Sequence, residues 1–132
     1  MNLQATVLVT GAAHRLGAEI ATAFARAGWR VLCHYERSRE AAQALVQRLQ
    51  DEGLQAQAVQ GGLDSEAACL ALFEQARRAG PIHCVVNNAS TFFPDGGGDF
   101  RSEQALRQLQ VNLLAPLILG RELARQAHGD AS

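Results

Sequence analysis

The 132-residue sequence contains no lysine, one tyrosine and three cysteines, and no apolar run long enough to cross a bilayer. Its 12 basic residues other than histidine are all arginines, and 13 acidic residues leave a net charge of −1. A chain with so little net charge has no bulk attraction to nucleic acid or to an anionic membrane. Because the sequence contains no lysine, these 132 residues cannot supply a lysine amine for catalysis.

Cysteine and histidine are too few and too scattered to predict a disulfide framework or a metal site. Cys33, Cys69 and Cys84 are odd in number and lie in apolar surroundings, which favours buried free thiols in a reducing cytoplasm. The four histidines have no short spacing to cysteine, so we predict no metal site. We expect no leader segment, and the length predicts one domain over residues 1–132.

Short apolar runs alternate with helical periodicity along the whole chain. We predict strands over residues 5–10, 29–35, 55–60 and 82–86, with helices over 17–27, 38–53, 64–80 and 102–127. This βαβαβαβα order predicts a Rossmann-type α/β fold, a doubly wound parallel sheet with strand order 3-2-1-4. We expect the chain to stop before the fifth strand. Residues 91–101, which include three consecutive glycines, are predicted to be a mobile loop.

The turn after the first strand reads TGAAHRLG, residues 10–17. A dinucleotide-binding turn places small residues at the sharp bend, at the pyrophosphate and at the helix–strand contact. Gly11 and Gly17 fit the first and last places, and Arg15 fills the middle one. An arginine gives up close backbone approach but supplies a charged, planar donor group. The alternatives are a tight turn that binds nothing and an Arg15 that only faces solvent.

Four blocks of sequence together resemble the short-chain dehydrogenase/reductase family. They are TGAAHRLG at 10–17, HYERS at 34–38, NNAS at 87–90 and VNLLAP at 111–116. Arg15, HYERS and the aromatic pair after NNAS resemble the pteridine reductase branch more narrowly. The resemblance implies hydride transfer from NADPH to a dihydropterin-like, dihydrofolate-like or carbonyl substrate. It implies cofactor contacts from Gly11, Arg15, Leu16, Gly17, Tyr35, Arg37, Ser38, Leu63, Asn87 and Ala89.

The end of the second strand bears on the choice between NADP(H) and NAD(H). Arg37 and Ser38 can hold a 2′-phosphate, and Ser38 lies at a helix start, where anions are favoured. Glu36 argues the other way, because a carboxylate there can accept from a ribose 2′-hydroxyl. The resemblance favours NADP(H). The family also places an acidic residue beside the adenine at the position of Gly62, so this chain departs from the family there.

The substrate side is predicted at the end of the fourth strand. By resemblance, Ser90 contacts pterin or cofactor, and Phe92 stacks a pterin ring against the nicotinamide. The alternative is that Phe92, Phe93 or both pack on the long helix. Pro116 has no N–H to offer the carbonyl of Asn112, so the helix should kink there. Asn112 also matches the family's helix asparagine, whose carbonyl holds a water in a proton relay.

The catalytic Tyr-x-x-x-Lys segment that the resemblance implies is absent, because the one tyrosine is Tyr35 and no lysine occurs. The chain by itself should therefore bind a dinucleotide without reducing a substrate. The alternative is a stand-alone dinucleotide-binding module or sensor. Leu113 and Leu117 are expected to be exposed on the helix at 102–127, where they should meet a missing half of the protein or a partner, and where we expect a homo-oligomer to form.

Overall fold

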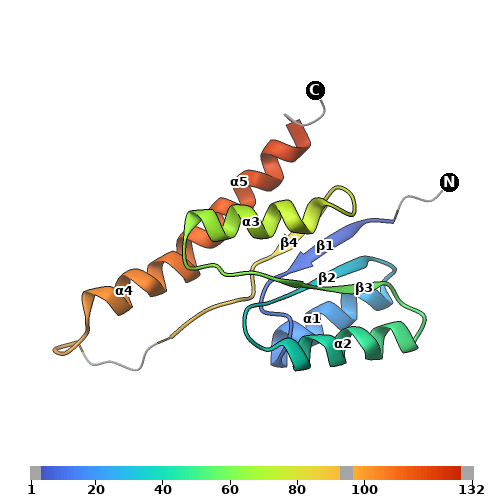
Figure 1. The fold of residues 1–132 in the computed structure, drawn as a ribbon, viewed down its shortest axis with the longest axis horizontal. Coiled ribbons are helices and arrows are strands. Elements are labelled where there is room, and N and C mark those ends of the chain that lie inside the picture. Colours follow the sequence, from blue (N-terminus) through green and yellow to red (C-terminus); the bar gives the residue numbers. More distant parts are fainter. Residues whose placement is uncertain (1–3, 93–96, 129–132) are drawn as a thin grey trace.

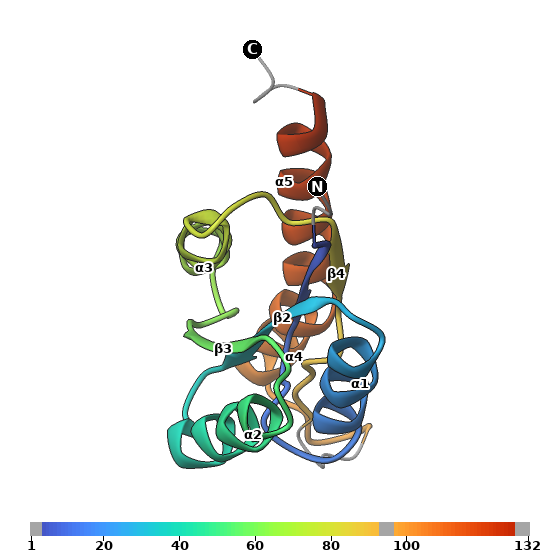
Figure 2. The same ribbon diagram turned by 90° about the vertical axis from the view of Figure 1, so that its right-hand side faces the viewer.

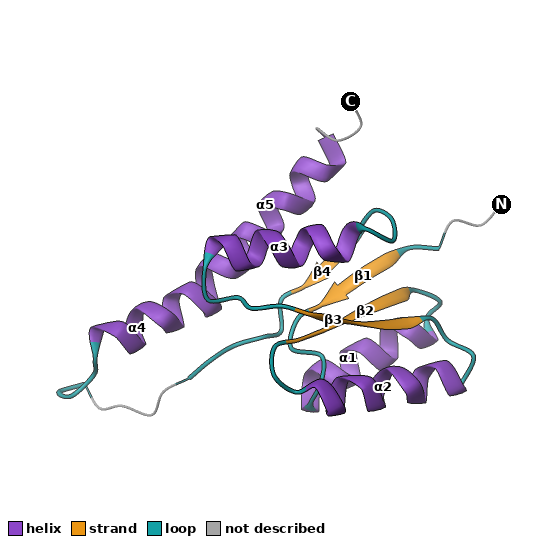
Figure 3. Cartoon of the chain, in the orientation of Figure 1, coloured by secondary structure: helices purple, strands orange, loops and turns teal. Residues whose placement is uncertain are grey.

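The computed structural model describes residues 4–92 and 97–128, and its centre is a four-stranded parallel sheet (Figures 1 and 3). The strands are β1 (Thr6–Val9), β2 (Arg30–Tyr35), β3 (Ala56–Gln60) and β4 (Cys84–Val86). The first three helices are α1 (Arg15–Arg26), α2 (Arg39–Asp51) and α3 (Glu66–Arg77). The order β3-β2-β1-β4 confirms the predicted sheet.

Alternation of side chains along the buried strands divides the core into two layers. Val7 and Val9 of β1 contact the α1–α2 layer, while Leu8 between them contacts the layer built from α3 and the last helix. Strand β2 repeats the pattern with Val31 and Cys33 on one face and Leu32 on the other. Figure 2 shows α3 and the α1–α2 pair on different sides of the strands. Successive side chains of a strand point to opposite faces, which explains the division.

The predicted long helix is continuous but changes its winding at the predicted kink. It consists of α4 (Ser102–Leu109), a π-helical turn η1 (Gln110–Leu114) and α5 (Ala115–His128). The amide N–H of Ala115 donates to the carbonyl of Gln110, five residues back. Pro116 removes one helical donor just beyond this turn, so the widened turn lies where the sequence predicts the regular pattern to fail.

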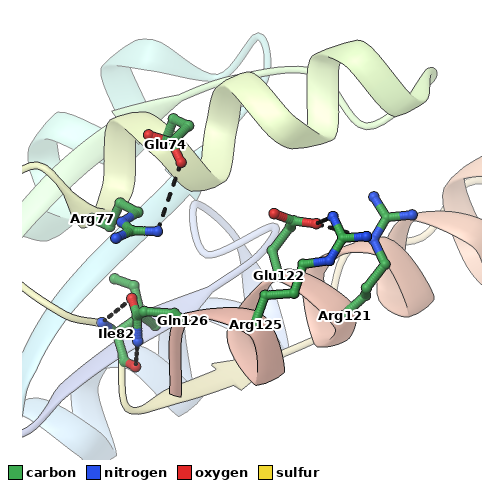
Figure 4. A network of polar contacts seen from close by, with 7 residues as sticks. All are labelled: Glu74, Arg77, Ile82, Arg121, Glu122, Arg125 and Gln126. Atoms are coloured by element: carbon green, nitrogen blue, oxygen red, sulfur yellow. Dashed lines mark hydrogen bonds and ion pairs between the residues drawn. The ribbon is translucent and has the colours of Figure 1, made fainter. Parts of the chain in front are cut away.

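Two amide side chains fix the long helix against the chain on either side of β4. Before the strand, Gln126 accepts from the N–H of Ile82 at 3.0 Å and donates to its carbonyl at 2.7 Å (Figure 4). After the strand, Asn112 accepts from the N–H of Thr91 and donates to its carbonyl, both at 2.8 Å. Because each amide satisfies both groups of one residue, the pair sets the position of the helix along β4.

Burial also explains the chemistry of the cysteines. Cys33 and Cys69 are buried, Cys84 is half-buried, and all three are free. Burial raises the pKa of the Cys33 thiol to about 12, so this group stays protonated and acts as a small apolar side chain.

His34 is a buried polar side chain that joins three segments of the sheet. Its Nδ1 accepts from the N–H of Gly11 at 3.0 Å, so its Nε2 carries the proton and donates to the carbonyl of Gly61 at 2.8 Å. The side chain is 2% exposed. Burial lowers the pKa of His34, while the bond to Gly61 and the charge of Glu36 oppose that shift. The neutral ring therefore holds the turn after β1 to the end of β3.

This arrangement predicts that acid destabilises the fold through His34. The unfolded imidazole titrates near a pKa of about 6.5, and the folded one titrates lower. The contribution is therefore complete above about pH 6.5 and declines below it by up to about 1.4 kcal/mol per pH unit. Urea unfolding between about pH 5.5 and 7.5 measures the slope.

Two variants isolate the contribution of His34 to this slope. His34→Gln should flatten the slope, whereas His128→Gln, which changes an exposed histidine at the end of α5, should leave it intact. Equal slopes in the wild type and His34→Gln would contradict the assignment.

Candidate functional site

Polar contacts join the turn after β1 to the turn after β4 at the carboxyl edge of the sheet. The Thr10 hydroxyl accepts from the backbone N–H groups of Asn88 and Ala89, both at 3.0 Å. The Asn88 side-chain amide donates to the carbonyls of Thr10 at 3.2 Å and Gly11 at 3.0 Å. We call this set of bonds between Thr10, Gly11, Asn88 and Ala89 the β1–β4 joint. It brings the predicted TGAAHRLG and NNAS segments into contact.

The two glycines of the turn are required by this close packing. Gly11 has a φ of +62°, and a Cβ atom there would lie 3.0 Å from the Cα of Ala89. A Cβ atom on Gly17 would collide with the carbonyl oxygen of Gly11 and lie 2.6 Å from Nδ2 of Asn88. A side chain at position 11 would push this turn away from the segment after β4, and one at position 17 would push α1 away from the turn, as expected for the first and last glycines of a dinucleotide turn.

Arg15, between these glycines, has a left-handed backbone with a φ of +50°. It is the only residue other than glycine with a positive φ in the described part of the chain. Such a conformation costs a residue with a Cβ atom about 1 kcal/mol or more. A glycine at this position would avoid that cost. The presence of an arginine with an exposed side chain therefore indicates that the side chain has a function.

A continuous groove runs along this edge and consists of two adjoining cavities that share Gly11, Ala89 and Ser90. We call it the carboxyl-edge groove. Its first cavity is lined by Gly11, His34, Glu36, Leu63, Ala89, Ser90, Thr91, Arg107 and Val111. Its second cavity is lined by Gly11, His14, Arg15, Leu16, Gly17, Asn88, Ala89 and Ser90. The groove lies where ligands bind in open parallel sheets.

The start of α2 meets the turn after β1 beside the second cavity. The Ser38 hydroxyl lies 3.0 Å from Nε2 of His14, which also lines that cavity. Arg37 is exposed next to Ser38, so an imidazole, a guanidinium and a hydroxyl are available to an anion at this corner. Tyr35 is buried at 8% exposure and lines neither cavity. Asn87 is exposed and lines neither cavity, so a cofactor role for either residue stays a prediction.

The two predicted substrate residues are both exposed, but only Ser90 lines the groove. Ser90 lines both cavities, and Phe92 is 78% exposed, so Phe92 does not pack on the long helix. Phe93 and part of the loop predicted to be mobile lie outside the described residues. Asn112 is exposed, and its side chain binds Thr91, which fixes the start of that loop to η1.

Sequence reasoning missed three residues that organise the groove. Thr10, His14 and His34 lie inside the TGAAHRLG and HYERS blocks, but the sequence predicted no role for their side chains. The Thr10 hydroxyl accepts two backbone N–H groups, and each histidine joins two segments that are distant in sequence. A histidine inside an apolar strand was the available signal, because a buried imidazole needs hydrogen-bond partners.

Metal binding and membrane crossing find no support in the described residues. Within residues 4–92 and 97–128, no group of three or more His, Cys, Asp or Glu side chains could hold a metal ion. No helix in the described part of the chain has the length and apolar character needed to cross a membrane.

Comparisons with known proteins identify this arrangement. Residues 5–131 match the short chain dehydrogenase family model. Versicolorin reductase 1 of Aspergillus parasiticus is 34% identical over 119 residues, which are 89% of this chain and 45% of the relative. 1-Cyclohexenylcarbonyl-CoA reductase of Streptomyces collinus is 30% identical over 118 residues, covering 89% of this chain and 42% of the relative.

Solved structures show the same fold with a bound dinucleotide. FolM alternative dihydrofolate reductase 1 of Brucella canis, in complex with NADP, has a TM-score of 0.87 and 35% identity over 96% of this chain and 51% of that one. A blue fluorescent protein from a metagenomic library, in complex with NADPH, has a TM-score of 0.85 and 30% identity. The match covers 97% of this chain and 53% of that one. This chain therefore spans about half the length of the proteins it matches, and it belongs to the short-chain dehydrogenase family.

Proposed function

We propose that this chain forms the NADP(H)-binding half of a cytoplasmic reductase that acts on a dihydropterin-like or dihydrofolate-like substrate. The observation that carries the proposal is the carboxyl-edge groove, where two glycines admit close approach and Arg15 adds a cation. The NADP complexes of related structures support the cofactor. The three free thiols favour a reducing compartment.

The groove offers matched groups along its length. Backbone amides at the start of α1 would hold the pyrophosphate, because a helix N-terminus presents free N–H groups to an anion. Arg37 and Ser38, with His14 beside them, would hold the 2′-phosphate. Leu63 and Ala89 would flank the nucleoside in the first cavity. These residues have the chemistry that a phosphorylated dinucleotide requires.

The nicotinamide, when bound, supplies the hydride. Ser90 lines both cavities of the groove, and a flat heteroaromatic substrate could stack on the exposed ring of Phe92, two residues further along the chain. Arg15 lines the same cavity as Ser90, so its guanidinium can reach both a phosphate and a ring substrate. The backbone carbonyl of Asn112 is predicted to hold a water molecule in a proton relay, as in the family. A tyrosine acid with a lysine four residues later is absent from this sequence, so the complete reaction requires residues that the sequence does not contain.

The apolar face of the long helix supports a homo-oligomer. Leucines of α4, η1 and α5 are 44–65% exposed: Leu106, Leu109, Leu113, Leu114 and Leu117. A contiguous patch of this kind marks an association surface more often than a free one. Sedimentation equilibrium measures the association, and a monomer at about 100 μM would contradict it.

Titration of the wild type and Arg15→Gly tests the proposed function. NADPH should raise the melting temperature of the wild type more than NADH does, because only NADPH carries the 2′-phosphate. Arg15→Gly should be as stable as the wild type or up to about 1 kcal/mol more stable, since glycine tolerates a positive φ. In an active enzyme containing this chain, the variant should lose more dihydropterin turnover than NADPH affinity.

Arg78→Gly is the matched control, because it removes the same charge at an exposed position that lines no part of the groove. Its cofactor affinity and turnover should equal those of the wild type. Stabilisation by NADH but not by NADPH would refute the cofactor choice. If Arg15→Gly lost turnover and NADPH affinity equally, Arg15 would bind only the cofactor phosphate and would have no role in substrate binding.

A further inference from the structure

The surroundings of Gly62 explain why this position, acidic in the family that the sequence resembles, has no side chain in this protein. A Cβ atom on Gly62 would lie 3.2 Å from Oδ1 of Asp64 and 3.6 Å from Oε1 of Glu36. A carboxylate at position 62 would therefore enter a space already bordered by two carboxylates, and like charges so close repel each other. These neighbours therefore disfavour an acidic side chain at position 62.

Of the two neighbouring carboxylates, Glu36 is the one available to a ligand. Asp64 forms an ion pair with Arg107 at 3.6 Å and lines neither cavity of the groove. Glu36 lines the first cavity, and no cation within residues 4–92 and 97–128 forms an ion pair with it. The side-chain amide of Gln60 donates to the backbone carbonyl of Glu36 at 3.1 Å, which holds the residue beside the end of β3.

The first cavity has the chemistry of a purine pocket. Leu63 and Val111 give it apolar walls, and the carboxylate of Glu36 at its edge accepts hydrogen bonds. The 6-amino group of adenine donates, whereas a 6-oxo group in the same place accepts. A carboxylate acceptor at this edge therefore distinguishes between the two bases.

We propose that Glu36 accepts a hydrogen bond from the 6-amino group of the adenine, in place of the acid missing at position 62. This inference rests on the proposed function, since the adenine belongs to the dinucleotide. It also gives Glu36 a role other than binding a ribose 2′-hydroxyl. Its Oε1 faces Gly62 at the end of β3, whereas the Ser38 hydroxyl at the other side of the loop faces His14.

Calorimetric titration of the chain with three dinucleotides tests the assignment. They are NADPH, its analogue with hypoxanthine in place of adenine, and NADH. The wild type should bind NADPH on the order of tenfold more tightly than the hypoxanthine form, as expected for a hydrogen bond to a charged group. Glu36→Gln should reduce that preference to about one, because its amide can donate to a 6-oxo group. The preference for NADPH over NADH should not change.

Glu40→Gln is the matched control, because it removes the same charge from an exposed position that lines neither cavity. It should keep the preference for adenine. An unchanged base preference in Glu36→Gln would overturn the inference, and a changed ratio of NADPH to NADH affinity would assign Glu36 to the ribose. If the wild type binds none of the three dinucleotides, the proposed function fails and the inference fails with it.

Discussion

The β1–β4 joint is the contact on which the rest of the site depends. Thr10 is buried at 1% exposure, and its hydroxyl satisfies two backbone N–H groups of the segment after β4. The Asn88 amide then binds the carbonyls at the start of the turn after β1. These bonds place Gly11 against Ala89, and they leave no space for a side chain at position 17. Loss of the joint would separate the two segments that form both cavities of the groove.

Several residues around the β1–β4 joint have energetically unfavourable conformations or surroundings, and they lie where a ligand would bind. Arg15 keeps a left-handed backbone that a glycine would adopt more easily. His34 is a buried imidazole whose neutral form is needed for its two hydrogen bonds. Glu36 presents to the first cavity a carboxylate that forms no ion pair with the described residues. Strain, burial of a titratable group and exposed charge concentrate at one edge of the sheet, as expected where function competes with stability.

Most of the fold could be predicted because each element has its own sequence signal. The alternation of Val7, Leu8 and Val9 predicts a strand buried on both faces, and Pro116 predicts the irregular turn in the long helix. Ser65 lies at the predicted start of the third helix, and its hydroxyl accepts from the N–H of Ala68 at 3.1 Å. These signals act within a few residues of chain, so spacing alone reveals them.

The site was less predictable because its decisive contacts join segments far apart in sequence. The Thr10–Asn88 and Asn112–Thr91 bonds depend on how the strands and the long helix are placed in space. The position of Glu36 beside Gly62 arises because the end of β2 lies next to the end of β3. A sequence pattern shows that Glu36 is charged, but only the packed strands show which cavity it lines.

The affinity of Thr10 variants for NADPH tests the central role of the β1–β4 joint most directly. Thr10→Val keeps the shape of the side chain but loses the hydroxyl, so the Ala89 N–H loses its acceptor and the Asn88 N–H keeps only the carbonyl of Val86 at 3.1 Å, at a cost of about 1–3 kcal/mol. Thr10→Ser keeps the hydroxyl and loses only a methyl group, at a cost of about 1 kcal/mol. The structure predicts that Thr10→Val binds NADPH at least about tenfold more weakly than Thr10→Ser, which should remain close to the wild type. Equal affinities of Thr10→Val and the wild type for NADPH would contradict the central role of the joint.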